Sequence, residues 1–288
     1  MKRVLSTYLF SARPLTQQAV VEAAGAGAEA IELFCAPGHF DYRSVSRRRE
    51  LAGWLERAGL VLHSVHAPTE NDHPGRGGTP LSIAEPERVR RLQAVDEIKR
   101  VLELAETVPF GVLVLHLGPA GQPADPRCYD AAFSSVEHLL LFARPLGIAL
   151  ALENLPGELA APAQLVAFLQ QTHLERVGLC FDTGHAHLGD GVEASFEAMR
   201  PHLLSTHVHD NRGARDDHLV PFEGALPWPQ VMALLATAPR PLPLVLELKE
   251  PEPGAAAGVL RKLPGVFSRL EELAAAAARP EGGGSRNG

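Results

Sequence analysis

The sequence predicts an α/β fold of the (β/α)₈ TIM barrel type, on three observations. Short runs rich in Val, Ile and Leu recur along the chain, longer amphipathic stretches separate them, and there are eight such runs. Eight parallel strands joined by crossover helices close into a barrel, and 288 residues is an ordinary length for one barrel domain. We therefore expect a single domain over residues 1–278 and a disordered tail over 279–288, where RPEGGGSRNG has no apolar pattern.

The apolar runs and the stretches between them define the expected elements. Strands are expected over 4–10, 30–35, 60–68, 111–118, 148–155, 177–185, 203–211 and 244–250. Helices are expected over 15–26, 43–58, 86–108, 129–143, 162–172, 193–200, 228–238 and 257–278. Two loops rich in Gly and Pro, 69–85 and 118–128, follow the third and fourth strands, on the side of a barrel where active sites lie.

The clearest helical spacing lies in residues 86–108. Apolar residues recur there at intervals of three or four positions, namely Val89, Leu92, Val95, Ile98 and Leu102. Pro86 is expected in the first turn of this helix, where the missing N–H of proline costs no hydrogen bond. The spacing predicts an amphipathic helix with these apolar residues on one face.

The composition argues against general binding to nucleic acid or to a membrane. The net charge of −7 and the pI near 6.0 give no overall attraction for phosphate backbones or anionic lipid. Two groups of arginines, Arg47, Arg48 and Arg49 and then Arg88, Arg90 and Arg91, are interpreted as helix faces in water. We therefore expect neither nucleic acid nor a membrane as a partner.

The cysteines and the N-terminus indicate a reducing compartment. Cys35, Cys128 and Cys180 are odd in number, widely separated and without CxxC spacing, which favours reduced core thiols over disulfides or a thiolate zinc site. The N-terminus has no apolar run of signal-peptide length, and no window approaches the length of a membrane-spanning helix. The expected location is the cytoplasm.

Residues that can bind a metal stand at the ends of six expected strands. They are His66, His116, Glu153, Asp182, His207 and Glu247. Because all strand C-termini of a parallel barrel lie at one mouth, we expect these side chains to converge. Buried carboxylates are costly unless they are paired or bound to metal, and mixed imidazole and carboxylate ligands suit zinc, manganese, iron or cobalt better than calcium. The pattern predicts a site for a divalent ion such as Mn, Zn, Co or Mg.

Taken singly, several of these residues have an ordinary structural interpretation. His66 or His116 alone is more typical of a hydrogen-bonded core histidine, whereas a lone carboxylate such as Glu153 in an apolar strand has few structural explanations. Asp182 can cap the following turn, and His185 can be a surface residue. Residues 203–218 include His207, His209, Asp210, Asp216, Asp217 and His218, of which at least two are expected to be solvated. The joint occurrence of the six strand-end residues is what indicates metal binding.

Four segments, in the order of the last four strands, resemble the xylose isomerase-like barrel superfamily. They are ALEN (151–154), FDTGHA (181–186), HVHDNRGARDDHLVPFEGALPW (207–228) and LELK (246–249). The third is most similar to the sugar phosphate isomerase/epimerase group, whose members carry an HxHDN…DxHLxPGxG run. Phe222 and Glu223 stand in place of the usual Pro-Gly pair, which predicts a loop of different shape. The resemblance covers essentially the whole chain except the tail.

The resemblance implies a metal-dependent isomerase or epimerase of a small sugar, sugar phosphate or related polyol carbonyl compound, active in carbohydrate metabolism. The single-metal site of the group maps onto Glu153, Asp182, His207 and Glu247. The two glutamates are also implied to transfer a proton through a cis-enediolate. His185 matches a position that contacts substrate hydroxyls, and His66 and His116 are expected to line the substrate pocket. Similar proteins are frequently homo-oligomers.

A second branch of the superfamily, endonuclease IV, uses nine ligands to hold three zinc ions at abasic DNA sites. Its pattern can be placed on His66, His116, Glu153, Asp182, His185, His207, Asp216, His218 and Glu247. Under this alternative, extra metal ligands are expected at His66, His116, His185, Asp216 and His218. Every position of the nine has a residue that can bind zinc.

Three departures favour the isomerase interpretation over DNA repair. The endonucleases have HxxY after strand three, a His-Pro-Gly turn after strand four and HLND on strand seven, whereas this chain has HAPT at 66–69, HLGP at 116–119 and HVHD at 207–210. The aromatic content of 6 % also leaves few residues to stack on bases. A third class, a non-catalytic metal-binding barrel, stays open, although Glu153 and Glu247 have a ready use in proton transfer.

Overall fold

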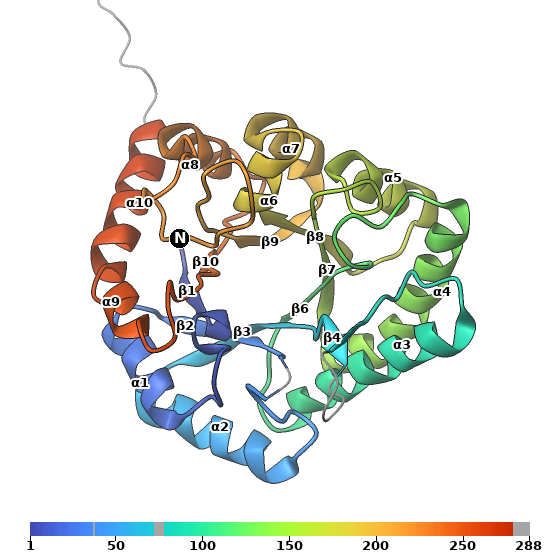
Figure 1. Cartoon of the computed structure of the whole chain (residues 1–288), viewed down its shortest axis with the longest axis horizontal. Coiled ribbons are helices and arrows are strands. Elements are labelled where there is room, and N and C mark those ends of the chain that lie inside the picture. Colours follow the sequence, from blue (N-terminus) through green and yellow to red (C-terminus); the bar gives the residue numbers. More distant parts are fainter. Residues whose placement is uncertain (37, 72–77, 279–288) are drawn as a thin grey trace, which may run out of the picture.

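Eight parallel strands form the inner wall of the molecule (Figure 1). The computed structural model describes residues 1–36, 38–71 and 78–278. Its barrel strands are β1 (Arg3–Ser6), β2 (Ala30–Phe34), β3 (Val61–His66), β6 (Val112–Leu115), β7 (Ala149–Glu153), β8 (Val177–Asp182), β9 (Leu203–His207) and β10 (Leu244–Leu246). Each overlaps one of the eight predicted runs, so the predicted fold is confirmed. A short antiparallel pair, β4 (Glu70–Asn71) and β5 (Thr79–Pro80), lies in the loop after β3.

Hydrogen bonds join the strands in the order β10-β1-β2-β3-β6-β7-β8-β9. Closure between β9 and β10 rests on a single isolated parallel bridge, between Val208 and Leu246. There the N–H of Val208 donates to the carbonyl of Val245 at 2.8 Å. The barrel is therefore nearly closed, with its shortest ladder between the last two strands.

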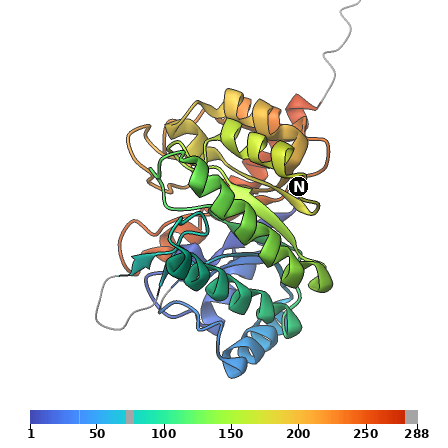
Figure 2. The same cartoon turned by 90° about the vertical axis from the view of Figure 1, so that its right-hand side faces the viewer.

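Helices cover the outside of the strands (Figures 1 and 2). They are α1 (Gln17–Gly25), α2 (Val45–Ala58), α3 (Arg88–Leu102), α4 (Pro126–Ala143), α5 (Pro162–Thr172), α6 (Thr183–Leu188), α7 (Val192–Met199), α8 (Trp228–Ala236), α9 (Ala256–Leu260) and α10 (Leu263–Ala277), with 3₁₀ turns at Thr7–Phe10, Glu103–Glu106, Arg144–Leu146 and Arg200–His202. The stretch predicted as one helix over 257–278 is two helices, α9 and α10. The expected disordered tail at 279–288 lies outside the described residues.

All eight strands end before their predicted ends, and at β1 and β8 a side chain caps the turn that follows. The hydroxyl of Ser6 accepts from Tyr8 N–H and ends β1, so residues 7–10 form a 3₁₀ turn instead of strand. The carboxylate of Asp182 accepts from His185 N–H at 2.7 Å and starts α6 directly after β8. The predicted capping role of Asp182 is thus confirmed.

The predicted first turn of α3 was wrong. Glu87 is the N-cap, and its carboxylate accepts from Val89 N–H at 2.8 Å and Arg90 N–H at 3.0 Å, so Pro86 precedes the helix. Val89 and Leu92 are exposed, at 62 % and 44 %, whereas the later apolar residues of the pattern are buried. The first turns of α3 therefore project beyond the core, and only its later turns pack on the barrel.

Arg48 does not lie on a solvated helix face. Its side chain is buried, its Nε donates to the Tyr42 carbonyl at 2.5 Å, and its Nη2 pairs with the Glu103 carboxylate at 2.9 Å. These contacts join the loop before α2 to the end of α3. The residue is therefore a structural link, which sequence spacing could not distinguish from its exposed neighbour Arg49.

The three cysteines are buried free thiols, as predicted. Burial raises the pKa of Cys35 and Cys180, so both are held as neutral thiols. Across the described ranges, no helix is both long enough and apolar enough to span a membrane.

Candidate metal centre

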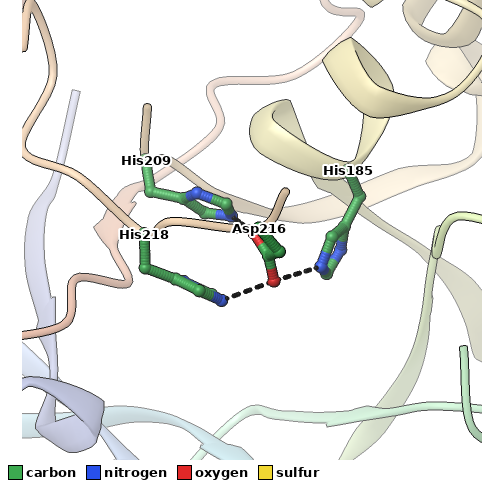
Figure 3. Close-up of side chains that lie close together, drawn as sticks. All are labelled: His185, His209, Asp216 and His218. Carbon is green, nitrogen blue, oxygen red and sulfur yellow. Dashed lines mark hydrogen bonds and ion pairs between the residues drawn. The ribbon is translucent and has the colours of Figure 1, made fainter. Parts of the chain in front are cut away.

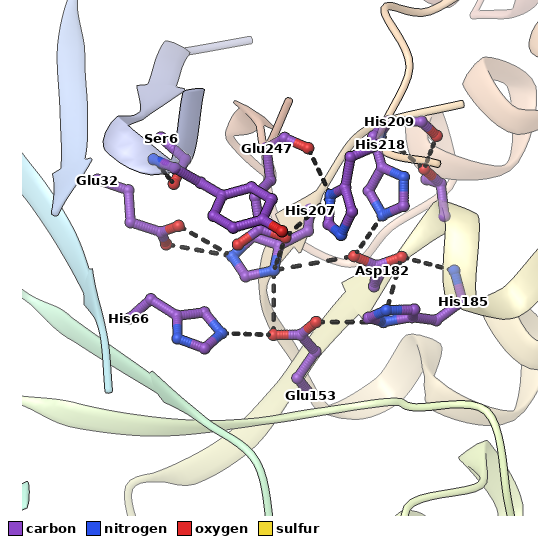
Figure 4. Close-up of polar contacts among 12 residues, drawn as sticks. Ser6, Glu32, His66, Glu153, Asp182, His185, His207, His209, His218 and Glu247 are labelled. Atoms are coloured by element: carbon purple, nitrogen blue, oxygen red, sulfur yellow. Dashed lines mark hydrogen bonds and ion pairs between the residues drawn. The ribbon is translucent and has the colours of Figure 1, made fainter. Parts of the chain in front are cut away.

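The predicted strand-end residues lie together at one mouth of the barrel. His66, Glu153, Asp182 and His207 are the last residues of β3, β7, β8 and β9 (Figure 4). His116 and Glu247 follow β6 and β10 by one residue. All are fully or almost fully buried except His116, whose side chain is 20 % exposed. The convergence predicted from the parallel strands is therefore confirmed.

Three of these residues surround one nitrogen of the imidazole of a fourth, His207. The Nδ1 atom lies 3.0 Å from an oxygen of Glu153, 3.7 Å from one of Glu247 and 3.9 Å from one of Asp182. One possible ligand atom from each of the four residues lies within 4.8 Å of the others. The structure thus brings together the four residues onto which the family resemblance maps a single-metal site.

This set of donors fits a divalent cation. Two ligand atoms that each lie about 2.1 Å from an ion, in directions at right angles to one another, are about 3 Å apart. The distance from His207 Nδ1 to the nearest oxygen of Glu153 is 3.0 Å. Glu153 Oε1, His207 Nδ1 and Glu247 Oε1 are buried and have no hydrogen-bond partner among the described residues. Buried polar atoms without a partner are costly, and a cation would satisfy them.

The charges of this group stabilise one another. Burial disfavours the carboxylate of Glu153, but His207 and His116 outweigh burial and hold its pKa well below the ordinary value. Burial also disfavours the imidazolium of His207, but the carboxylates of Glu247 and Glu153 outweigh it and raise its pKa well above 6.5. The raised pKa means that a cation bound at His207 has to compete with a proton.

A second group of possible ligands adjoins the first (Figure 3). Asp216 Oδ2 lies 2.9 Å from His218 Nε2 and 3.1 Å from His185 Nε2, while Asp216 Oδ1 lies 3.8 Å from His209 Nε2. Asp182 joins the two groups, because its Oδ2 is 3.0 Å from His209 Nε2 and 3.9 Å from His207 Nδ1. His185 is buried rather than a surface residue.

His66 and His116 form a third group with Glu153. Their Nε2 atoms lie 3.3 and 3.4 Å from the same oxygen, Glu153 Oε2. The other ring nitrogen of His66 bonds the Ala67 carbonyl at 2.7 Å. Neither histidine is therefore an isolated core residue, and all nine positions of the endonuclease-like pattern fall in three adjoining groups.

Sequence reasoning missed two residues of this site. Glu32 is fully buried in β2, with an oxygen 3.1 Å from His207 Nε2, and His209 is fully buried beside Asp182. The signal for Glu32 was a lone carboxylate in the apolar run AIELFC, the same signal that singled out Glu153. The expectation of at least two solvated residues in 203–218 was wrong, since only Asp216 of the six is exposed and it contacts two histidines.

Asp210 organises the loop between β9 and α8, which carries Asp216 and His218. Its carboxylate accepts from Trp228 Nε1 at 2.7 Å and from the backbone N–H groups of Phe222 and Leu226 at 3.0 Å each. Phe222 adopts φ 77°, in the left-handed region that favours glycine, so a glycine-type turn forms here although a phenylalanine occupies it.

Replacing Asp210 with Ala should lower the free energy of unfolding by about 1–3 kcal/mol, because several buried donors lose their acceptor. Denaturant unfolding monitored by circular dichroism would measure the loss. Asp190, an exposed aspartate before α7, is the matched control, and Asp190→Ala should stay within about 0.5 kcal/mol of the parent chain. Equal stability of the two variants would contradict the role given to Asp210.

The stability of the metal-free protein should fall as the pH rises from about 7 to 10. Burial disfavours charged His218, but Asp216 and Glu247 outweigh it and raise its pKa to about 9. A histidine with a raised folded-state pKa contributes stability below its unfolded pKa, and this contribution is lost as the pH rises through about 9. Thermal unfolding across this range measures the effect. His218→Gln should flatten the dependence, and a midpoint that rises with pH would refute the assignment.

Comparisons with known proteins agree with this architecture. The model of the xylose isomerase-like TIM barrel family matches residues 20–263. A similar sequence is protein y4fM of Sinorhizobium fredii (strain NBRC 101917 / NGR234), which is 29 % identical over 258 residues, 77 % of this chain and 78 % of that protein. Fructoselysine 3-epimerase of Escherichia coli O157:H7 is 23 % identical over 190 residues, 63 % of this chain and 68 % of that enzyme.

Solved structures share the fold. A D-tagatose 3-epimerase-like protein has a TM-score of 0.75 at 23 % identity, covering 94 % of this chain and 99 % of its own. An IOLI protein with a bound zinc atom has a TM-score of 0.71 at 15 % identity, covering 94 % of this chain and 98 % of its own. With a family model that spans most of the barrel and the strand-end residues in place, the chain belongs to the xylose isomerase-like TIM barrel family.

Proposed function

We propose that this protein is a metal-dependent isomerase or epimerase of a small sugar or related polyhydroxylated carbonyl compound. The observation that carries the proposal is the convergence of Glu153, Asp182, Glu247 and the Nδ1 atom of His207 at the mouth of the barrel. A divalent ion held by these four residues would act as a Lewis acid toward a substrate carbonyl oxygen. The epimerases among the similar proteins support a sugar-like substrate.

Each of the two glutamates can use one carboxylate oxygen for metal binding and the other for proton transfer. Oε2 of Glu153 and Oε2 of Glu247 face His207 Nδ1, whereas both Oε1 atoms have no hydrogen-bond partner among the described residues. One glutamate, as the carboxylate, can take the proton from the carbon beside the carbonyl through its free oxygen, and the other glutamate, entering in its protonated form, can give a proton to the resulting enediolate. Proton exchange of both groups with solvent then restores their starting states. Addition of the proton to the opposite face of the same carbon gives epimerisation, and addition of the proton to the neighbouring carbon gives isomerisation.

His185, His66 and His116 are proposed to orient the substrate. His185 lies 3.3 Å from Glu153 Oε1, and its Nδ1 is 3.0 Å from the Asn154 carbonyl, so its ring is fixed beside the proposed base. His116 is the most exposed of the three, which gives a bound substrate access to its ring. Substrate hydroxyls are good partners for imidazole nitrogens.

The test combines a metal count with deuterium exchange. Elemental analysis of protein purified without added metal or chelator should give about one ion per chain, and incubation with a panel of ketoses, sugar phosphates and inositol-derived ketones in D₂O should place deuterium beside the carbonyl of the substrate. Metal-bound protein that exchanges no proton on any member would overturn the proposal and favour a non-catalytic metal-binding barrel.

The three adjoining groups favour one second candidate, an endonuclease IV-like zinc enzyme acting at abasic sites in DNA. His66 and His116 would extend the centre on one side, and His185, Asp216 and His218 on the other. Two or three zinc ions per chain, lost on replacing His66 or His218, together with cleavage of an abasic-site duplex, would place this candidate first. The net charge of −7 weighs against it, since DNA binding rests mainly on phosphate contacts.

A further inference from the structure

Glu32 is a buried carboxylate that the proposed ligand set does not include. It lies in the middle of β2 and is fully buried. Its partner His207 is in β9, and the sheet order places β10 and β1 between these two strands. The contact therefore crosses the interior of the barrel rather than joining neighbouring strands.

The Glu32 carboxylate occupies one nitrogen of the His207 ring. His207 Nε2 is 3.1 Å from Glu32 Oε1 and 3.2 Å from Glu32 Oε2, and the Ser64 hydroxyl donates to Oε2 at 2.8 Å. Figure 4 shows the imidazole of His207 between Glu32 on one side and Glu153 and Asp182 on the other. Glu32 is in none of the candidate ligand groups of the described chain, so its effect reaches the other carboxylates through this ring.

A histidine that binds metal through one ring nitrogen usually donates its other N–H to a carboxylate, carbonyl or water. This donation fixes the tautomer, because the nitrogen that donates cannot also bind a metal, and it fixes the orientation of the ring. In this site the other nitrogen is Nδ1, which is buried, has no hydrogen-bond partner within the described part of the chain and lies nearest to Glu153.

We propose that Glu32 is a positioning residue, which holds His207 with Nε2 protonated and Nδ1 turned to the metal centre, and that Ser64 orients Glu32. The inference rests on the proposed metal site. It assigns a role to a β2 residue that contacts neither the proposed ion nor a substrate. Since loss of such a partner typically weakens metal binding about 10- to 100-fold, the effect is measurable without knowing the substrate.

Zinc affinity of matched variants tests the proposal. Glu32→Leu removes the acceptor and should weaken zinc binding by about 10- to 100-fold, while Glu32→Gln keeps an acceptor oxygen and should restore part of the affinity. Glu97→Gln is the control, because Glu97 is also a buried glutamate but pairs with Arg43 and Arg100 outside the barrel. Its zinc affinity should equal that of the parent chain. Equal affinity of Glu32→Leu and the parent chain would overturn the inference and leave the proposed metal site standing.

The ring nitrogen that binds metal can be read directly in the unaltered protein. Nitrogen-15 NMR of the zinc-loaded chain, with the His207 signals assigned by their absence in His207→Gln, should show Nδ1 bound to zinc and a proton on Nε2. Zinc on Nε2 would overturn the inference even if every Glu32 variant failed to fold. No zinc binding by the parent chain at all would overturn the proposed function as well.

Discussion

Replacing Glu153 with Gln should reduce the exchange of substrate protons with solvent by about 10²- to 10⁴-fold, because a neutral amide cannot take a proton from carbon. The side chain is 1 % exposed and its oxygens contact four histidines, so glutamine keeps the shape of the group while removing its charge. Deuterium incorporation from D₂O, followed by NMR on an accepted substrate, measures the change.

Two controls separate chemistry from folding in this experiment. Glu137 is an exposed glutamate on α4, and Glu137→Gln should exchange protons at the rate of the parent chain. Circular dichroism and the thermal unfolding midpoint of Glu153→Gln should show an intact barrel. Undiminished exchange by a folded Glu153→Gln protein would remove Glu153 from the proposed acid/base pair.

Removing the metal should produce the second large effect, on stability. An ion present at about 1,000 times its dissociation constant stabilises the folded state by about 4 kcal/mol, which corresponds to a thermal midpoint about 8–16 °C higher. Dialysis against a chelator should therefore lower the midpoint by this amount, and added zinc or manganese should restore it. His207→Gln, which lacks the central nitrogen of the group, should show little response to either treatment.

The two forms of the protein should respond to pH in opposite directions. A cation displaces protons from histidines whose pKa is raised, such as His207, so its binding strengthens as the pH rises. The metal-free protein instead loses the His218 contribution as the pH passes about 9. The difference between the two thermal midpoints should thus widen from about pH 6 to 9, and a constant difference would argue against protonated histidines at the centre.

The fold and the strand-end residues could be predicted because both follow from strand periodicity, whereas the set of four metal ligands among them was implied by the resemblance to the xylose isomerase-like superfamily. Apolar runs mark parallel strands, and a polar residue at the end of such a run must lie at the mouth of the barrel. Glu153, Asp182 and His207 were found by this rule at the strand ends where the structure places them. The same rule located Glu247 and His116 to within one residue of a strand end.

The remaining residues escaped because their roles depend on contacts between distant elements. Glu32 lies within its strand rather than at the end, and its partner His207 is 175 positions away. The buried ring of His209 packs against Gly184. A Cβ atom added at Gly184 would lie 2.0 Å from His209 Cε1, so only glycine leaves room for the ring there. Arg48 is buried and pairs with Glu103, in the 3₁₀ turn after α3, a contact that the sequence of its own helix does not encode. The periodic pattern of apolar residues within one segment gives no information about such contacts between distant segments.

The shortest ladder of the barrel lies next to two of the proposed ligands. One backbone bridge, Val208 to Leu246, joins β9 to β10, and the adjacent residues are His207 and Glu247. An ion shared by these two side chains would cross-link the strands that the backbone holds together least. Such a cross-link would make closure of the barrel and occupation of the site a single cooperative event, so that slow amide exchange at Val208 would report a loaded site.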